Sequence, residues 1–249
     1  MNIEKIDSAI VNRAYKLNFD NVYKLIDFKP FILAGGALCS GKVNDYDIYP
    51  VYGNPFDTET ISTFITESDE ILKWCEIICK TKNALTVKVD GQVFQFCNYC
   101  KPSLKELIES FDFSHCQVGV MFKGDGEPPH ADGVYYTEDF VVSNVTNNTI
   151  YTGSKYPLSS LIRTVKYAKR EKFAGKSYAT AIIEILKDII TRGFDDYDDF
   201  KDQLDAVDLN YDGEEVSDLW LAVRDHLLYR SKKDTGESPT SNENDDFPF

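Results

Sequence analysis

The chain has 249 residues, 43% of them hydrophobic, which suits one or two globular units with a buried core. Its formal net charge is -14, whereas proteins that hold a large stretch of nucleic acid are usually basic, so an extended nucleic-acid footprint is disfavoured. The sequence has no apolar run long enough for a transmembrane helix and begins without a signal-peptide pattern. We therefore expect a cytoplasmic protein without a membrane partner, in the host cytoplasm if it is viral.

Apolar spacing divides the chain into three predicted regions. Residues 1–155 form a head, over which helices within residues 1–27 pack. Residues 156–230 form a helical neck and body. Residues 231–249 are predicted to be a disordered acidic tail, because they are rich in Asp, Asn, Ser and Glu and short of apolar residues.

Two glycines end a short apolar run near the start of the head. The run from Phe31 to Ala34 is typical of a buried strand, and Gly35 and Gly36 follow at once. Glycine permits a sharp turn and leaves room for a ligand close to the backbone. A short helix is expected to begin there, and its free N–H groups would attract phosphate oxygens. The turn therefore predicts a phosphate-binding site.

Asp45 and Asp47 flank Tyr46 at the start of a second predicted strand, which runs to Val51. Residues two apart on a strand face the same way, so the two carboxylates share one face while Tyr46 and Ile48 take the other. Two like charges held together are costly unless a cation lies between them. Mg²⁺ or Mn²⁺, bridging the carboxylates and a triphosphate, is the predicted occupant. Either half of this pattern alone would indicate only a turn or a solvated strand edge.

The rest of the chain carries further helix and strand patterns. An Asp-Gly pair between alternating apolar residues predicts a β-hairpin over residues 86–96. Gly193 is expected to end an amphipathic helix over residues 178–191. Capping residues and apolar spacing predict helices over residues 57–66, 69–81, 102–111 and 157–229. Further strands are predicted over residues 115–122, 134–140 and 149–152.

Taken in order, these segments resemble the nucleotidyltransferases of the polymerase-beta superfamily. The arrangement is most similar to the head and neck of bacterial-type CCA-adding enzymes and poly(A) polymerases, where Gly-Gly-Ala-Val-Arg-Asp precedes Asp-Ile-Asp. The segment from Phe111 to Cys116 is similar to the family's Arg-Asp-Phe-Thr-Ile-Asn, and that from Tyr156 to Phe173 to its neck helix. The resemblance covers about residues 28–175. In overall character the chain is also similar to nucleotidyltransferase-like proteins of tailed bacteriophages.

The resemblance implies an α+β fold, with a polymerase-beta-like head of mixed sheet and helices before an all-helical C-terminal region. It also implies a magnesium-dependent transferase that binds a nucleoside triphosphate such as ATP. On this basis Asp45 and Asp47 are the metal ligands and the first catalytic residues. Asp112, at the matched position, either completes the metal shell or reads the ribose.

The same resemblance implies a set of nucleotide-binding residues. Backbone N–H groups near Gly35 and Gly36, together with the Ser40 hydroxyl, would hold the β- and γ-phosphates. Arg163 and Lys166, in the segment similar to the neck helix, would neutralise the triphosphate. The basic residues around Lys166 could instead be an ordinary solvated helix face.

The sequence also departs from the family pattern. Cys39 and Ser40 replace the Arg-Asp after the two glycines, and Gln95 lies on the strand that often carries a third carboxylate. The template that reads the incoming base is replaced by Tyr156, Pro157 and Ser160. The resemblance thus supports nucleotidyl transfer, whereas the replaced template residues argue against templated CCA addition.

Cysteines and one histidine offer weaker signals. In a reducing compartment the six cysteines are expected to be free thiols. Cys75, Cys79, Cys97 and Cys100 could instead supply four zinc ligands, but the first two fall one turn apart on the helix predicted for residues 69–81, where Cys is an ordinary core residue. His115 is expected to be a satisfied core residue rather than a catalyst.

The sequence thus favours a magnesium-dependent nucleotidyltransferase that moves a nucleotide to an acceptor hydroxyl on an RNA end, such as that of a tRNA, or on a protein. The alternative is a non-catalytic nucleotide-binding or virion-associated interaction protein with the same fold. A third possibility is a toxin- or antitoxin-type nucleotidyltransferase. The acidic tail ends in Phe247-Pro248-Phe249, which could contact a protein partner or be an ordinary disordered end.

Overall fold

The computed structural model describes residues 3–17, 19–38, 45–54, 56–123, 131–205 and 220–221, with side chains from Ser8 onward except that of Asp205. Two compact units make up the chain. One unit consists of Met1–Ser154 and Tyr167–Tyr178, and the other of Lys155–Lys166 and Ala179–Phe249. The predicted tail, residues 231–249 with Phe247 to Phe249, lies outside the described residues.

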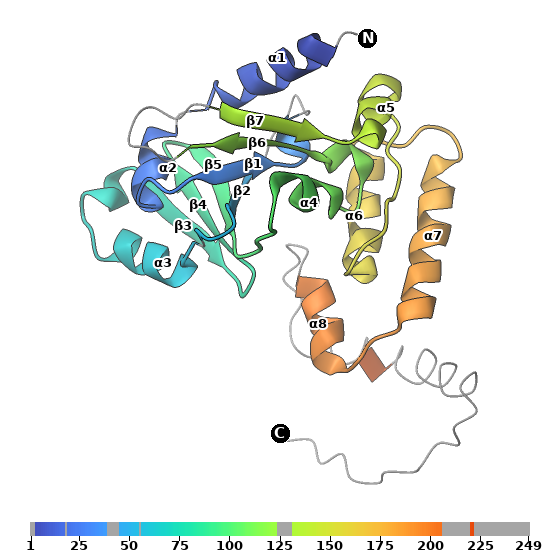
Figure 1. Cartoon of the computed structure of the whole chain (residues 1–249). Coiled ribbons are helices and arrows are strands. Elements are labelled where there is room, and N and C mark those ends of the chain that lie inside the picture. Colours follow the sequence, from blue (N-terminus) through green and yellow to red (C-terminus); the bar gives the residue numbers. More distant parts are fainter. Residues whose placement is uncertain are drawn as a thin grey trace. The chain divides into compact units, whose positions relative to one another are not determined.

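The first unit is built on a seven-stranded sheet with the order β3-β4-β5-β2-β1-β6-β7 (Figure 1). Neighbouring strands are antiparallel except β2 and β5, which run parallel. The sheet is therefore mixed, and with its helices it confirms the predicted α+β class. The strands are β1 (Phe31–Ala34), β2 (Tyr46–Pro50), β3 (Cys75–Lys80), β4 (Ala84–Val89), β5 (Gln92–Cys97), β6 (Val118–Phe122) and β7 (Ala131–Tyr136).

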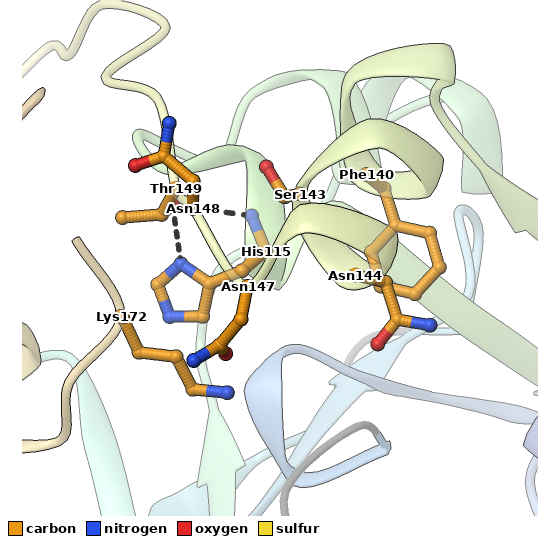
Figure 2. A pocket seen from close by; sticks show the side chains of 8 residues that line it. All are labelled: His115, Phe140, Ser143, Asn144, Asn147, Asn148, Thr149 and Lys172. Carbon is orange, nitrogen blue, oxygen red and sulfur yellow. Dashed lines mark hydrogen bonds between the residues drawn. The ribbon is translucent and has the colours of Figure 1, made fainter. Parts of the chain in front are cut away.

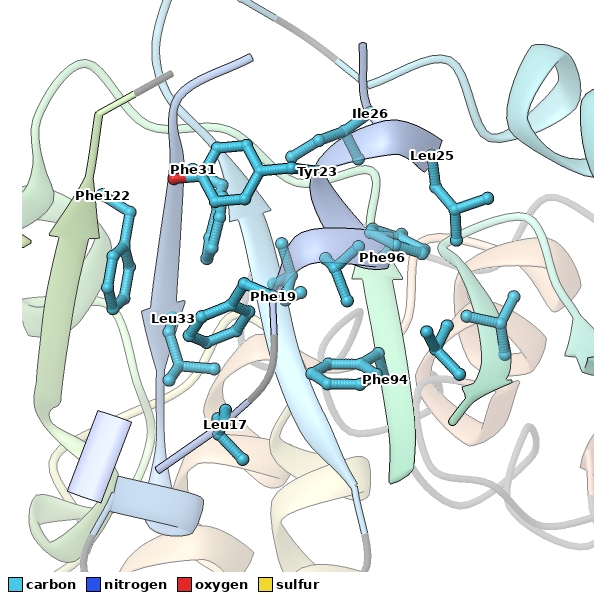
Figure 3. Packing of buried hydrophobic residues seen from close by; sticks show 14 of the residues in the cluster. Leu17, Phe19, Tyr23, Leu25, Ile26, Phe31, Leu33, Phe94, Phe96 and Phe122 are labelled. Atoms are coloured by element: carbon cyan, nitrogen blue, oxygen red, sulfur yellow. The ribbon is translucent and has the colours of Figure 1, made fainter. Parts of the chain in front are cut away.

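Aromatic rings fill the core on the first face of the sheet (Figure 3). Phe19, just before α2 (Asp20–Leu25), lies 5.2 Å from Phe31 and 5.0 Å from Phe122 between ring centroids. Phe94 and Phe96 of β5 are fully buried in the same cluster. Burial of such rings is the largest source of hydrophobic stabilisation in a core. The helices α1 (Ile3–Ala14) and α3 (Thr58–Thr66) also contribute buried residues to it.

The second face of the sheet is covered only in part. Leu107 and Ile108 of α4 (Leu104–Glu109) pack against Ile32 and Ala34 of β1. The approach is close, because a Cβ built on Gly119 of β6 would lie 2.6 Å from the Ile108 side chain. Farther along the sheet the cover on this face of β4 and β5 is uneven, because Ala84 and Cys97 are buried. The other residues on this face are half-buried or exposed: Thr86, Lys88, Val93 and Gln95.

Several local predictions are confirmed. Asp57 caps α3 by accepting the N–H groups of Glu59 and Thr60. The predicted hairpin is β4 and β5, and its Asp90-Gly91 turn has φ angles of 49° and 84°. Both residues thus have the positive φ that a two-residue hairpin turn requires.

The helix predicted for residues 69–81 is wrong. Only a short 3-10 turn, η2 (Ile71–Lys73), precedes β3, which is an edge strand paired with β4. Apolar residues at helical spacing also occur in a strand with a bulge, and the register shifts between Ile77 and Cys79. The β-branched pair Ile77 and Ile78 fits the strand better than a helix.

The segment around residues 134–152 also differs from its prediction. The strand predicted for residues 134–140 ends at Tyr136, and α5 (Glu138–Thr146) follows, with Thr137 as its cap. The strand predicted for residues 149–152 is reduced to one bridge between Phe113 and Tyr151. The strand predicted for residues 115–122 begins only at Val118, because η3 (Ser114–Cys116) precedes it.

The second unit is helical where the structure describes it. Within it lie the first turns of α6 (Pro157–Lys169), most of α7 (Ser177–Arg192) and α8 (Tyr197–Asp205). Gly193 ends α7 with a φ of 67° and donates its N–H to the Ile189 carbonyl over 2.9 Å, as predicted. The Trp220 ring packs against Phe194, Tyr197 and Phe200. None of the described helices is both long and apolar enough to cross a membrane.

Candidate functional site: a glycine turn beside an aspartate strand

The Gly35–Gly36 turn lies at the end of β1. Gly35 has a φ of 91°, in the region that favours glycine, and its N–H donates to the Val118 carbonyl of β6 over 2.9 Å. The predicted helix after the glycines is a single 3-10 turn, η1 (Gly36–Leu38), in the described part of the chain. Because the Gly35 N–H is already bonded within the sheet, phosphate contacts would have to begin at Gly36.

Asp47 lies directly beside this turn. It pairs with Ala34 of β1 on one side and with Gln95 of β5 on the other. A Cβ built on Gly35 would lie 3.5 Å from the Asp47 Oδ2 atom, so the carboxylate lies over the bend of the glycine turn. The structure thus brings together Gly35 and Asp47, which are twelve residues apart in the sequence.

Asp45 immediately precedes β2, and its side chain, like that of Asp47, is half-buried. Tyr46 and Ile48, between and after the two acids, pack in the core of the first sheet face. The alternation predicted for this strand is therefore present. Half-buried carboxylates keep access to solvent and so can receive a hydrated cation.

Gln95 is the neighbour of Asp47 across the parallel strand pair. Its Nε2 atom donates to the Thr86 Oγ1 atom of β4 over 3.2 Å. Asp47, Gln95 and Thr86 therefore form one row across three strands of the second sheet face. An amide in this row supplies neutral hydrogen-bonding groups where a carboxylate would add a third negative charge.

Arg13 is a candidate that the sequence analysis missed. From the last turn of α1, its Nη1 atom donates to the Leu38 carbonyl at the end of η1 over 2.9 Å. Burial raises the pKa of the Tyr46 phenol, and the Arg13 charge offsets part of that rise. A guanidinium thus lies at the base of the glycine turn. No local pattern connects Arg13 with Gly35, so only the folded chain reveals it.

Behind the turn lies a buried polar layer made by η3. A Cβ built on Gly36 would lie 3.6 Å from the Cys116 Sγ atom and 3.9 Å from the His115 Cδ2 atom. The His115 Nδ1 atom and the Thr149 Oγ1 atom share a hydrogen bond of 2.6 Å. Burial, together with Lys172 and Arg170, lowers the pKa of His115 to about 3. His115 is therefore a neutral, satisfied core residue at pH 7, as predicted.

Asp112 lies at the start of this layer and is 7% exposed. Its carbonyl accepts the Thr152 N–H over 2.9 Å, which ties it to the segment after α5. Gln117 supports the same backbone by donating from Nε2 to the Phe111 carbonyl over 2.9 Å. The role predicted for the Asp112 carboxylate, as metal ligand or ribose reader, stays a prediction.

The structure does not test three of the predicted nucleotide-binding residues. Ser40, like Cys39, lies outside the described residues. Arg163 and Lys166 lie on α6 within the second unit, whereas Gly35 and Asp47 belong to the first. The contact of Arg163 and Lys166 with a triphosphate stays a prediction.

A small pocket lies beside His115 (Figure 2), lined by His115, Phe140, Ser143, Asn144, Asn147, Asn148, Thr149 and Lys172. Its volume of about 20 Å³ has room for a water molecule and not for a nucleotide.

Among the described residues, no group of three or more His, Cys, Asp and Glu side chains is arranged to hold a metal ion. The Asp45–Asp47 pair would therefore need phosphate oxygens and water to complete a metal shell.

Comparison with known proteins assigns the chain to a family. A family model described as "Gabija anti-defense 2 family protein" (Gad2) matches residues 5–147, more than half of the chain. The protein belongs to the Gad2 family. The match spans the whole glycine–aspartate site, from Arg13 through Asp47 to Asp112. No curated protein sequence matches this Gad2 protein.

Solved structures with low identity are also similar to this Gad2 protein. One is the Thermotoga maritima CCA-adding enzyme complexed with tRNA-CCA, at 10% identity and a TM-score of 0.46, with 95% of this chain and 57% of that chain covered. Another is a tRNA nucleotidyltransferase complexed with a primer tRNA and an incoming ATP analog, at 14% identity and a TM-score of 0.43, with 89% and 63% covered. The chain thus spans about three fifths of the length of these proteins.

Proposed function

We propose that this Gad2 protein is a divalent-metal-dependent nucleotidyltransferase. The observation that carries the proposal is the Asp47 carboxylate over the positive-φ turn at Gly35, with the half-buried Asp45 two residues away. Triphosphate chemistry requires a cation site and close approach of the phosphates to the backbone. A carboxylate pair beside a glycine turn supplies both.

The chemistry we assign to this site is an in-line displacement. The hydroxyl oxygen of an acceptor attacks the α-phosphorus of the triphosphate, and the bond from that phosphorus to the bridging oxygen breaks. Pyrophosphate leaves with the electron pair, and the hydroxyl proton is released to solvent. Asp45 and Asp47 would hold Mg²⁺, which when bound stabilises negative charge on the attacking and leaving oxygens. Asp112 would assist as a third acid or a ribose contact.

The donor set at the site fits Mg²⁺. Magnesium in phosphate-transfer sites takes one or two protein carboxylates and completes its shell with water and substrate oxygens. Asp45 and Asp47 supply two carboxylates, and Gln95 adds no third charge. We assign the phosphates to the residues from Gly36 onward, with Ser40, Arg163 and Lys166 as further contacts and Arg13 as support for the turn.

The proposed reaction lacks a strict base code. Tyr156, Pro157 and Ser160 replace the template residues of the resembling enzymes, and the Ser160 hydroxyl donates to the Tyr156 carbonyl over 3.3 Å. We therefore expect weak discrimination between nucleotides. Since the family name sets its members against Gabija defense, we propose that nucleotidyl transfer in a host cytoplasm is how this protein acts.

The second candidate is a nucleotide-binding protein without catalysis, or a virion-associated interaction protein. Gln95 favours it because an amide lies beside Asp47 where a third carboxylate is often found. The net charge of -14 favours it because an acidic protein repels anionic substrates. Isothermal titration of each nucleoside triphosphate, with Mg²⁺ and with excess chelator, tests binding. A pyrophosphate-release assay under the same conditions tests catalysis.

Nucleotide binding that needs Mg²⁺ and is accompanied by pyrophosphate release would support the enzyme. Binding without release in the presence of acceptors would favour the second candidate. Equal affinity in excess chelator would contradict the metal site, since the carboxylate pair repels phosphates when no cation is present.

A further inference from the structure

The second face of the sheet is only partly covered where it continues past the aspartates. The alternating side chains on the first face, such as Val87 and Phe94, are fully buried. On the second face α4 packs over the β1 side, but Thr86, Lys88 and Gln95 of β4 and β5 stay half-buried or exposed. We name this partly open surface the acceptor face and define it as Glu76, Thr86, Lys88, Val93 and Gln95.

Strand register places the acceptor face next to the proposed reaction site. Asp47, Gln95 and Thr86 form one row, and Glu76, Lys88 and Val93 form the row one step along the strands. An acceptor lying on this face would therefore reach Asp47 without crossing a helix of the first unit. The Gln95 amide, fixed by its bond to Thr86, is the hydrogen-bonding group in register with Asp47.

The charges of the acceptor face do not suit nucleic acid. Lys88 is its one cation, and Glu76 lies opposite Lys88 on the neighbouring strand. With Asp45 and Asp47 at its edge, acids outnumber bases around this face, and the whole chain has a net charge of -14. An RNA acceptor would need several Lys or Arg side chains for its phosphates. A polypeptide that carries Lys or Arg would instead be attracted.

The edge of the sheet favours an extended partner as well. β3 is the last strand of the sheet on this side, and its last three residues, Ile78 to Lys80, are exposed. An extended polypeptide can lie across such a face or pair along such an edge. RNA recognition relies instead on cationic and base-stacking surfaces, which the five residues of the acceptor face do not supply.

We propose that the acceptor of this enzyme is a hydroxyl side chain in a basic, extended polypeptide segment bound on the acceptor face. This inference rests on the nucleotidyl transfer proposed above and names its substrate class. The Ser, Thr or Tyr oxygen forms a phosphodiester bond to the α-phosphorus, the α-phosphorus bond to pyrophosphate breaks, and the hydroxyl proton goes to solvent. Gln95 positions the hydroxyl, and Glu76 attracts the flanking Lys and Arg side chains.

The test offers matched acceptors to the full chain. The protein is incubated with Mg²⁺, nucleoside triphosphates labelled at the α-phosphate, and one of three acceptors. The first is a peptide with one Ser, Thr or Tyr flanked by Arg and Lys. The second is the same peptide flanked by Glu, and the third is a tRNA transcript. Transfer is measured for the native protein, for Glu76→Lys on the acceptor face, and for Glu67→Lys, an exposed control beyond the end of α3. Titration of Mg²⁺ with nucleotide is run on each protein.

The expected result is label on the basic peptides and little on the acidic peptides or the tRNA. Glu76→Lys should lower peptide labelling about fivefold at low ionic strength, because it replaces attraction by repulsion. Glu67→Lys should leave it unchanged. Label on the tRNA alone, or a rise in tRNA labelling with Glu76→Lys and no peptide labelling, would overturn the inference. So would labelling of neither acceptor by a protein that binds Mg²⁺ and nucleotide. Loss of that binding would instead overturn the proposed function itself.

Discussion

Two regions of the first unit meet at the glycine turn, and they treat polar groups in opposite ways. On one side Asp45 and Asp47 are half-buried acids, and Asp47 lies in register with Gln95 on the second sheet face. On the other side Ser114, His115 and Thr149 are buried, and their polar atoms bond to one another. An open acid pair can bind and release a cation, whereas a closed polar network can only hold its geometry. On this basis we propose that the aspartate side carries the chemistry and that the η3 side keeps the turn rigid.

The largest effect is expected from the open side. Asp47→Asn or Asp45→Asn keeps the side-chain shape but removes a charge from the proposed Mg²⁺ site, so nucleotidyl transfer should fall at least about 100-fold. Pyrophosphate release measures the loss, and thermal unfolding should show a folded protein. Asp69→Asn, an exposed acid before η2, is the matched control. Full activity in the double variant Asp45→Asn/Asp47→Asn would exclude the aspartate side as the reaction site.

Gly35 and Gly36 allow a test of the turn itself. Gly35→Ala must adopt a φ of 91°, which costs about 1–3 kcal/mol in the free energy of unfolding, and the new Cβ would also contact the Asp47 carboxylate. Gly36→Ala should be milder, because its φ is not positive and its Cβ would meet Cys116 at an ordinary 3.6 Å. Urea unfolding of both variants gives the comparison. Equal destabilisation of the two variants would mean that crowding by η3, and not backbone strain at Gly35, determines the cost of adding a side chain at the turn.

The buried polar network around His115 should make the free energy of unfolding depend on pH. The pKa of His115 is lowered to about 3 in the folded chain, whereas an unfolded His titrates near its ordinary value of 6.5. Between these values the unfolded chain binds more protons, so the free energy of unfolding should rise with pH up to about 6.5, by at most about 1.4 kcal/mol per pH unit from this group. His115→Gln should flatten that rise. Urea unfolding at pH 5 and pH 7.5 measures it, and an unchanged slope in His115→Gln would show that other groups cause it.

Arg13 should give the smallest effect, because it supports the turn from beneath. Arg13→Met removes the bond to the Leu38 carbonyl, which is worth about 1 kcal/mol, so nucleotide affinity should fall about fivefold. Lys16→Met removes an exposed cation three residues farther along and should change affinity little. Titration calorimetry distinguishes the two. If Arg13→Met and Lys16→Met weaken binding equally, Arg13 contributes only its general charge.

The sequence by itself determined the features that depend on neighbouring residues. The glycines after Phe31 to Ala34, the alternation around Asp45 and Asp47, the cap at Asp57 and the Asp90-Gly91 turn are all local, because dihedral preferences and side-chain periodicity act over a few residues. These patterns were sufficient to predict the strand that carries the candidate acids, and the family resemblance implied the α+β class.

Tertiary structure decided what depends on distant partners. Residues 75–80 became an edge strand because β4 offered them a ladder of backbone hydrogen bonds, which outweighed helical spacing. Arg13 reaches the glycine turn only because α1 packs against β6, β7 and η1, and His115 is neutral only because η3, Thr149 and the segment of Lys172 enclose it. The Gly35 N–H is bonded to Val118, a partner more than eighty residues away that no local pattern can specify.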